Sequence, residues 1–333
     1  MLGMSQIITD GEKTVYPILF EVRYGQMKSI NCFLYKNGNT LTLLDAGIDM
    51  PAFHEFFFGK LAEYGFRIND IDQIILTHHH GDHTGMVNHI LAVKHVPVYA
   101  HPLAIERLHL TENYQLQKRD FFKKLYENYG CSHLAEKRLA KLAKTMKNSE
   151  RLRIKTDIIP LLDGDIIDDF KIIAAPGHSP DSILLHDTKT KWLFAGDLVL
   201  YTGTTSALVD HDEEGRLLPT VMQYKQSLEN CLHYNASMVF AGHQQPFSNL
   251  QEITQRNLER VSFQLQRIIN KIADGHETAL SIAYAIYGER TEKEFSIIMS
   301  EIIGYTCYAE EKGLVRKEMD EDGWHFFVNE RYK

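Results

Sequence analysis

Several short apolar runs rich in β-branched residues stand out along the first three quarters of the chain. Residues 72–77 form one such run, and residues 84–90 carry apolar side chains at helical spacing. This order of apolar run, polar turn and helical segment predicts a strand that passes into a helix. It indicates an α/β fold, in which reactive groups collect outside the carboxyl ends of the strands.

Residues 104–157 depart from this pattern because they show long helical spacing with many aromatic residues. Phe122 and Tyr126, and later Leu139 and Met146, indicate two or more amphipathic helices. The segment holds 13 Lys and Arg against 7 Asp and Glu. We expect a helical insertion, and one hypothesis for its role is a lid or pocket wall that attracts an anionic substrate. The alternative is an ordinary solvated helix face.

The last quarter of the chain predicts one long helix and then a small module. Apolar residues recur at helical intervals over residues 248–272, and Asp274-Gly275 supplies a stop signal. Two shorter helical segments follow, and two apolar strands are joined by a turn at residues 320–323. This is the layout of a winged helix. Residues 276–333 hold 7 Lys and Arg against 12 Asp and Glu, which favours a packing, dimerisation or pocket-completing role over binding to phosphates.

Potential metal ligands are concentrated directly after the strand at residues 72–77. His78, His80, Asp82 and His83 place four ligand-type side chains within six residues. Imidazole and carboxylate groups suit zinc, iron or manganese, and ligands this close must spread from a tight turn. These four ligands, together with ligands from elsewhere in the chain, are more than one tetrahedral ion needs. The motif therefore indicates two adjacent ions.

Three isolated ligand-type residues follow other apolar runs in a similar setting. His178, Asp197 and His243 each come after an apolar strand and beside a glycine. A glycine lets the backbone turn sharply and come close to an ion or substrate. One such residue alone is more often a hydrogen-bonded core or loop residue. Their occurrence together, in this order, predicts the remaining ligands.

With these motifs the sequence resembles the metallo-β-lactamase superfamily over roughly residues 15–250. The family motifs match, in order, at Asp45, His78, His80, Asp82, His83, His178, Asp197 and His243. The resemblance implies a four-layer αβ/βα sandwich with the metals at one edge between two sheets. We divide the chain into a catalytic domain at 1–250, a linking helix at 251–275 and a winged-helix-like module at 276–333.

The resemblance also implies a role for each ligand. One ion would be held by His78, His80 and His178, the second by Asp82, His83 and His243, and Asp197 would bridge both with a hydroxide. Asp45 would hold a ligating loop through hydrogen bonds, and His79 would point away. The expected cofactors are two divalent ions, zinc first, with iron or manganese as alternatives.

The chemistry expected from the resemblance is hydrolysis by the bridging hydroxide. Asp82 is a candidate to shuttle a proton through its spare oxygen. Tyr201, four residues after Asp197, is a candidate to donate a hydrogen bond to a developing oxyanion, as in lactone-cleaving relatives. The alternative for Tyr201 is a ring that packs beside the loop.

Ligand identities narrow the choice of reaction within the superfamily. Zinc β-lactamases typically have Cys or Ser where Asp197 stands, and flavodiiron oxygen reductases carry Glu where His80 stands. About 45 residues separate Asp197 from His243, too few for an inserted nuclease domain. The leading hypothesis is hydrolysis of a small ester, thioester or lactone. The alternatives are a phosphodiesterase or ribonuclease of the lactamase-beta-2-like type and a non-catalytic metal-binding sensor.

Overall composition limits the partners. The net charge of −8 disfavours a general nucleic-acid-coating role, although nucleic acid is not excluded. The four cysteines are far apart, and no signal-like or membrane-spanning apolar stretch is visible. We expect a cytoplasmic enzyme of 333 residues that acts on a small molecule, and the long helix with its small module would suit a homodimer.

Overall fold

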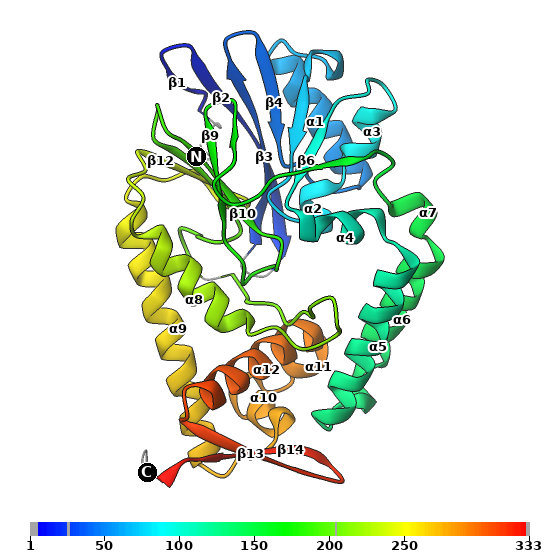
Figure 1. Ribbon diagram of the computed structural model, residues 1–333, viewed down its shortest axis with the longest axis vertical. Coiled ribbons are helices and arrows are strands. Elements are labelled where there is room, and N and C mark those ends of the chain that lie inside the picture. Colours follow the sequence, from blue (N-terminus) through cyan, green and yellow to red (C-terminus); the bar gives the residue numbers. More distant parts are fainter. Residues whose placement is uncertain (1–5, 25–26, 204, 331–333) are drawn as a thin grey trace.

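Two β-sheets packed face to face form the centre of the computed structural model, which describes residues 6–24, 27–203 and 205–330 (Figure 1). Within these residues the first sheet has seven strands in sequence order, antiparallel up to β4 and parallel from β4 to β7. Its strands are β1 (Ile8–Asp10), β2 (Lys13–Tyr24), β3 (Met27–Asn37), β4 (Thr40–Leu44), β5 (Gln73–Ile75), β6 (Val98–Ala100) and β7 (Ile158–Pro160).

The second sheet has the order β12-β11-β10-β9-β8, with β11 and β12 parallel and the other pairs antiparallel. Its strands are β8 (Ile166–Ile167), β9 (Phe170–Ala174), β10 (Ile183–Asp187), β11 (Trp192–Gly196) and β12 (Met238–Ala241). Aromatic side chains from both sheets fill the space between them. Phe33 of β3 contacts the rings of Phe194 and Phe240, with ring centroids 5.7 and 5.4 Å away.

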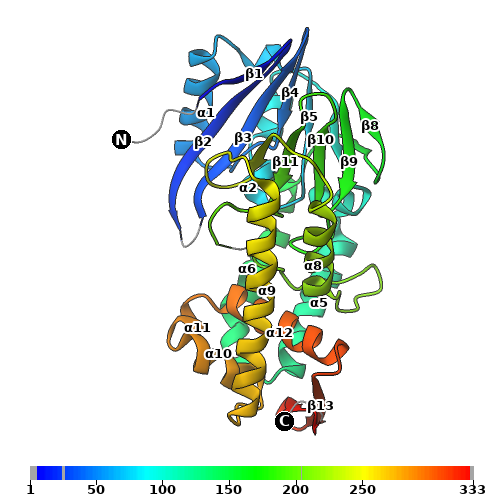
Figure 2. The same cartoon turned by 90° about the vertical axis from the view of Figure 1, so that its left-hand side faces the viewer.

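Helices cover the outer face of each sheet. On the first sheet, α1 (Pro51–Glu63) and α3 (Val87–Leu91) pack on the strands. On the second sheet, α8 (Thr220–Cys231) and α9 (Leu250–Ala273) do the same (Figure 2). Strand β3 shows why both faces must be covered: Cys32 and Leu34 face the helices, while Phe33 and Tyr35 face the other sheet. The predicted αβ/βα sandwich is confirmed.

The predicted helical insertion lies between β6 and β7. It consists of α4 (Ile105–His109), α5 (Glu112–Asn128), α6 (Ser132–Lys147) and α7 (Ser149–Leu152). Strand β7 then pairs directly with β6, so the chain returns to the same sheet after the insertion. This strand had no separate prediction, because three residues of which two are exposed give little apolar signal.

The C-terminal segment contains the predicted elements close to their predicted bounds. Helix α9 is followed by α10 (Ala279–Tyr287), α11 (Arg290–Lys293) and α12 (Phe295–Glu311). Strands β13 (Val315–Asp320) and β14 (Gly323–Val328) form the predicted hairpin. Its classification as a winged helix stays a prediction.

The insertion and the C-terminal segment share one hydrophobic core. Phe122 and Tyr126 of α5 lie in the same cluster as Phe295 and Ile302 of α12 and Phe326 of β14. The first half of α9 packs on the second sheet and its last turns enter this cluster. These helices therefore stand as one body beside the sandwich edge where β4 and β5 end (Figure 1). Among the described helices, none is both long enough and apolar enough to span a membrane.

Candidate metal centre

The candidate ligands all lie just beyond strand ends at one edge of the sandwich. His78 follows β5, His178 follows β9, Asp197 follows β11 and His243 follows β12. The antiparallel strand β10 lies between β9 and β11, so β9, β11 and β12 run in the same direction and end at the same edge. Side chains 165 residues apart in the sequence, from His78 to His243, are thereby brought together.

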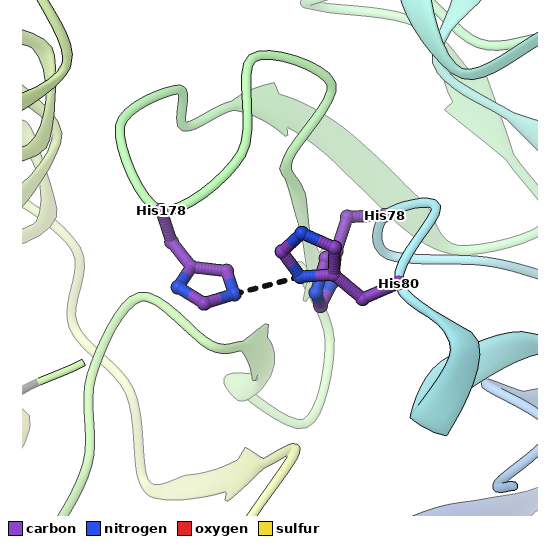
Figure 3. A group of neighbouring side chains, drawn as sticks. All are labelled: His78, His80 and His178. Atoms are coloured by element: carbon purple, nitrogen blue, oxygen red, sulfur yellow. Dashed lines mark hydrogen bonds between the residues drawn. The ribbon is translucent and has the colours of Figure 1, made fainter. Parts of the chain in front are cut away.

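Three imidazoles form the first group. His78, His80 and His178 offer ligand atoms that lie within 4.8 Å of one another. Figure 3 shows His178 reaching across from its loop toward His80, with His178 Nε2 3.0 Å from His80 Nδ1. The rings of His78 and His80 meet edge to face, with centroids 4.6 Å apart. This is the set that the sequence predicted for one ion.

The second group contains Asp82, His83 and His243, whose ligand atoms also lie within 4.8 Å. Asp82 and His83 belong to the one-turn helix α2 (Gly81–Thr84), which directly follows His80. His243 Nε2 lies 3.7 Å from Asp82 Oδ2. This set matches the three ligands that the sequence predicted for the second ion.

Asp197 lies between the two groups. Its carboxylate oxygens are 3.4 Å from His83 Nε2, 3.5 Å from His178 Nε2 and 3.1 Å from His243 Nε2. It therefore contacts imidazoles of both sets, as a bridging carboxylate must. The division of these residues between two ions remains a prediction.

Buried polar atoms without partners test whether this cluster suits a cation. Among the described residues, His78 Nε2, His83 Nε2 and Asp197 Oδ1 are buried and accept or donate no hydrogen bond. Such groups cost roughly 1–3 kcal/mol each when they stay unsatisfied. The three atoms lie in the group formed by His78, His83 and Asp197. A divalent ion between them would satisfy all three, so the residues fit a metal.

Hydrogen bonds on the far side of each ring fix which nitrogen faces the cluster. His83 Nδ1 donates to Asp45 Oδ2 at 2.8 Å, and His243 Nδ1 donates to the Ser29 carbonyl at 2.7 Å. His178 Nδ1 donates to the Ser206 carbonyl at 2.9 Å. Each bond leaves Nε2 free to bind an ion. The sequence could not reveal Ser29 or Ser206, because a backbone carbonyl carries no residue-specific signal.

Asp45 has the position that the sequence predicted for an orienting acid. Besides His83, it accepts hydrogen bonds from the Thr77 backbone N–H and hydroxyl, each at 2.8 Å. Its backbone has a φ of 55°, an uncommon conformation that Asp tolerates better than most residues. Asp45 thus connects the end of β4 to the start of the ligand motif and touches both Thr77 and His83.

His79 turns away from the cluster, as expected. Its Nδ1 lies 2.8 Å from Asp181 Oδ1, and its backbone N–H donates to the other oxygen of Asp181. Asp181 is fully buried, and its pKa is held below the ordinary range because contacts with His79 outweigh the effect of burial. Sequence reasoning missed Asp181, since an acid three residues after a ligand resembles any turn residue.

The electrostatics favour neutral, metal-binding imidazoles in the first group. Burial lowers the pKa of His78 and His80 well below the usual value, and repulsion by neighbouring imidazoles lowers it further. For Asp197, burial acts to raise the pKa, but His243 and His83 outweigh it and hold the pKa well below the ordinary range. At His83 and His243 the nearby carboxylates outweigh burial and raise the pKa, so an ion bound there would displace a proton from the imidazole.

Gly242 shows how closely the backbone approaches this centre. A Cβ atom at this position would lie 2.3 Å from Asp197 Oδ1 and 2.6 Å from His83 Cε1. Any side chain would therefore fill the space between the two groups of ligands. This confirms the expectation that a glycine beside a ligand permits close approach of the chain.

Tyr201 is a partly exposed residue in the loop after Asp197. Its side chain is 45% exposed, and its ring lies 5.7 Å from the ring of Phe247. The neighbouring Thr202 is bonded to the Gln244 side chain, with the Thr202 N–H donating at 2.8 Å. Since Gln244 follows His243, this contact holds the Tyr201 loop against the ligand loop. A catalytic role for Tyr201 stays a prediction.

Comparison with known proteins identifies the same family as the sequence motifs. The sequence profile described as the Metallo-beta-lactamase superfamily matches residues 26–243. The probable metallo-hydrolase YqjP of Bacillus subtilis is 23% identical over 270 residues, which cover 80% of this chain and 84% of that protein. The atrochrysone carboxyl ACP thioesterase of Aspergillus fumigatus is 23% identical over 279 residues, covering 79% and 70%.

Solved structures show that the likeness of fold extends to nearly the whole chain. A metallo-beta-lactamase family protein from Thermus thermophilus superposes with a TM-score of 0.77 at 19% identity, covering 95% of this chain and 98% of that one. A beta-lactamase domain protein from Burkholderia ambifaria gives 0.74 at 16% identity, covering 99% and 97%. With its motifs, sandwich fold and metal-binding cluster, the chain belongs to the metallo-beta-lactamase superfamily and is a metallo-hydrolase.

Proposed function

We propose that the protein is a dinuclear metal-dependent hydrolase that cleaves a small ester, thioester or lactone. The contact of Asp197 with imidazoles of both ligand groups carries this proposal, because one carboxylate between two donor sets suits a pair of ions. Two divalent ions in such a site supply a hydroxide at neutral pH and polarise a carbonyl oxygen.

The remaining chemistry belongs to residues of the chain. Asp82 is the most exposed carboxylate of the cluster, with 20% of its side chain accessible against 4% for Asp197. One oxygen can face His243 while the other faces solvent and holds a proton for the leaving group. Asp45 and the Ser29 carbonyl keep the imidazoles of His83 and His243 oriented during this exchange.

Two observations support the acyl substrate class. The fungal relative is named as a thioesterase, which cleaves an acyl bond. The net charge of −8 disfavours a nucleic-acid substrate, because phosphate contacts from Lys and Arg supply most non-specific affinity. The phosphodiesterase reaction remains the alternative outcome of the experiment below.

The test is a turnover assay of purified protein loaded with zinc or manganese. A panel of aryl esters, acyl thioesters and acyl lactones is compared with single-stranded RNA and a simple aryl phosphodiester. His243→Ala removes a ligand, and His233→Ala removes an exposed histidine elsewhere as the matched control. We expect acyl hydrolysis that His243→Ala abolishes and His233→Ala leaves intact.

The other possible outcomes of the turnover assay can be told apart. Cleavage of RNA or phosphodiester alone, lost in His243→Ala, would replace the acyl assignment with the phosphodiesterase one. Bound metal without turnover of any substrate would favour the sensor alternative. Activity that persists in His243→Ala would identify a contaminant and leave the acyl proposal contradicted.

A further inference from the structure

We propose that Asp49, His54 and His89 form a separate divalent-metal site in the helical layer over the first sheet. Asp49 lies in the loop after β4, His54 in the first turn of α1, and His89 in α3. The three offer ligand atoms within 4.8 Å of one another. None of them belongs to the groups around Asp197, and no sequence motif pointed to them.

The distances in this group match those of metal ligands. Asp49 Oδ1 lies 3.0 Å from His54 Nε2 and 3.1 Å from His89 Nε2. Donor atoms bound about 2.1 Å from one ion lie ~3.0 Å apart at a right angle and ~3.4 Å apart at the tetrahedral angle. The two distances to Asp49 Oδ1 fall within this range, and the ligand atoms of His54 and His89 lie within 4.8 Å of each other.

The same range of distances occurs inside the catalytic centre. There, His80 and His178 lie 3.0 Å apart and His83 lies 3.4 Å from Asp197. A second observation concerns His54, whose Nε2 is buried yet makes no well-oriented hydrogen bond among the described residues. Asp49 Oδ1 lies 3.0 Å from this nitrogen without forming a hydrogen bond with it, and an ion bound to both atoms would satisfy the nitrogen.

The donor set defines the class of ion. Two imidazoles and one carboxylate suit zinc, and also nickel, cobalt or copper, whereas calcium and magnesium prefer oxygen donors. His89 and Asp49 have 43% and 39% of their side chains exposed, so water can complete the coordination. Arg151 is the cation next to the group, 3.5 Å from the other oxygen of Asp49, and its side chain is 70% exposed and free to move outward.

Such an ion would hold the loop that supports the catalytic ligands. The Ala46 N–H donates to the His83 carbonyl at 2.6 Å, and the Gly85 N–H donates to the Gly47 carbonyl at 2.7 Å. The contact is so close that a Cβ on Gly85 would lie 2.1 Å from the Asp49 nitrogen. A metal on Asp49 would therefore connect α1 and α3 through a loop that is already bonded to the ligand helix α2.

Metal counting tests this site without using activity. The protein is loaded with excess Zn²⁺, passed through a desalting column, and its zinc content is measured per chain. The variants are His89→Ala, the milder His89→Gln, and the double variant His54→Ala with His89→Ala. The control is His233→Ala. We expect each His89 variant to lose one zinc per chain while the control loses none.

The number of ions in the catalytic centre does not affect the difference in zinc content between the variants and the unchanged protein. If the proposed dinuclear centre holds only one ion, the totals fall but the loss of one zinc on changing His89 persists. An unchanged zinc content in the double variant would overturn the peripheral site and leave the proposed function untouched. As a spectroscopic check, the protein is loaded with Co²⁺. The visible absorption of Co²⁺ should decrease in the same variants by the contribution of one site.

Discussion

The two edges of the β-sandwich both bury charged side chains, but only one of them leaves these side chains unsatisfied. At the edge where β5, β9, β11 and β12 end, Asp197 Oδ1 and two imidazole nitrogens have no hydrogen-bond partner among the described residues. At the opposite edge, Lys13 Nζ donates to Asp187 Oδ2 at 2.6 Å and pairs with Asp169 at 2.8 Å. The Tyr35 hydroxyl donates to the same Asp187 at 2.6 Å.

This contrast separates a binding site from a structural ion pair. The Lys13 group is complete within the chain: Asp187 also accepts backbone N–H groups of Lys189 and Thr190, so its carboxylate needs nothing further. The Asp197 group is complete only with an ion. Burial of charge alone therefore does not indicate function, whereas buried ligand atoms that converge without partners do.

The largest expected effect comes from the unsatisfied edge. Asp197→Asn should lower kcat/KM by roughly 10³-fold or more, a loss above ~4 kcal/mol, because the carboxylate between the two ligand groups is gone. The metal-free protein should keep its fold, since the amide has the size of the carboxylate and the rings of His83 and His243 keep their hydrogen bonds to Asp45 and the Ser29 carbonyl. Steady-state kinetics measure the loss of activity, and chemical denaturation of the metal-free variant measures its stability. An unfolded variant would show that Asp197 is needed for the fold and would contradict the contrast between the two edges.

Lys13→Met should lower the stability and leave the activity unchanged, the reverse of Asp197→Asn. It leaves Asp187 ionised, fully buried and without its cation, which typically destabilises a protein by about 3–5 kcal/mol. Metal content and activity of the molecules that remain folded should not change. Urea denaturation gives the free energy of unfolding. Adding Asp187→Asn to Lys13→Met should restore part of the stability, and a further loss would contradict the assignment of an ion pair.

Asp45→Asn should lower zinc affinity by about 10–100-fold, equivalent to ~1.4–2.7 kcal/mol. The amide keeps the size of the carboxylate and can still accept from Thr77, but it orients the ring of His83 less strongly. Competition with a zinc chelator measures the affinity. A matched change at the other edge, Asp169→Asn, should leave zinc affinity unaltered, and equal losses in both variants would point to a general effect on the fold.

Acid should act on the satisfied edge through Asp169, whose hydrogen bonds from Lys13 and Lys189 lower its pKa to about 2. An unfolded Asp has a pKa of about 3.9, so the folded state binds the proton more weakly. The resulting stability is present above about pH 5 and is lost as the pH falls toward 2. The stability difference between the protein and Asp169→Asn, measured in chelator, should shrink over this range. A constant difference would contradict the pairing.

The same contrast explains what the sequence could predict. His78, His80, Asp82 and His83 lie within one turn, and a run of ligand types is visible without any fold. Lys13 and Asp187 are end residues of β2 and β10, and Asp169 lies in a turn before β9. Only the packing of the two sheets brings these ordinary charges together. Asp49, His54 and His89 were missed for the same reason, since their spacing of 5 and 35 residues matches no local motif. Contacts made by topology alone carry no signal in a single sequence.

Tyr201 should give the smallest effect, because much of its side chain is open to solvent. If its hydroxyl donates to the developing oxyanion, Tyr201→Phe should lower kcat about tenfold, or ~1.4 kcal/mol, with little change in KM. This is less than the 10²–10³-fold cost of a buried donor, because water can partly replace a hydroxyl that is 45% exposed. The control is Phe247→Leu, which disturbs the ring beside Tyr201 but removes no hydroxyl. Equal kcat in Tyr201→Phe and the unchanged protein would assign Tyr201 to packing, and the oxyanion would then rest on the metal ions alone.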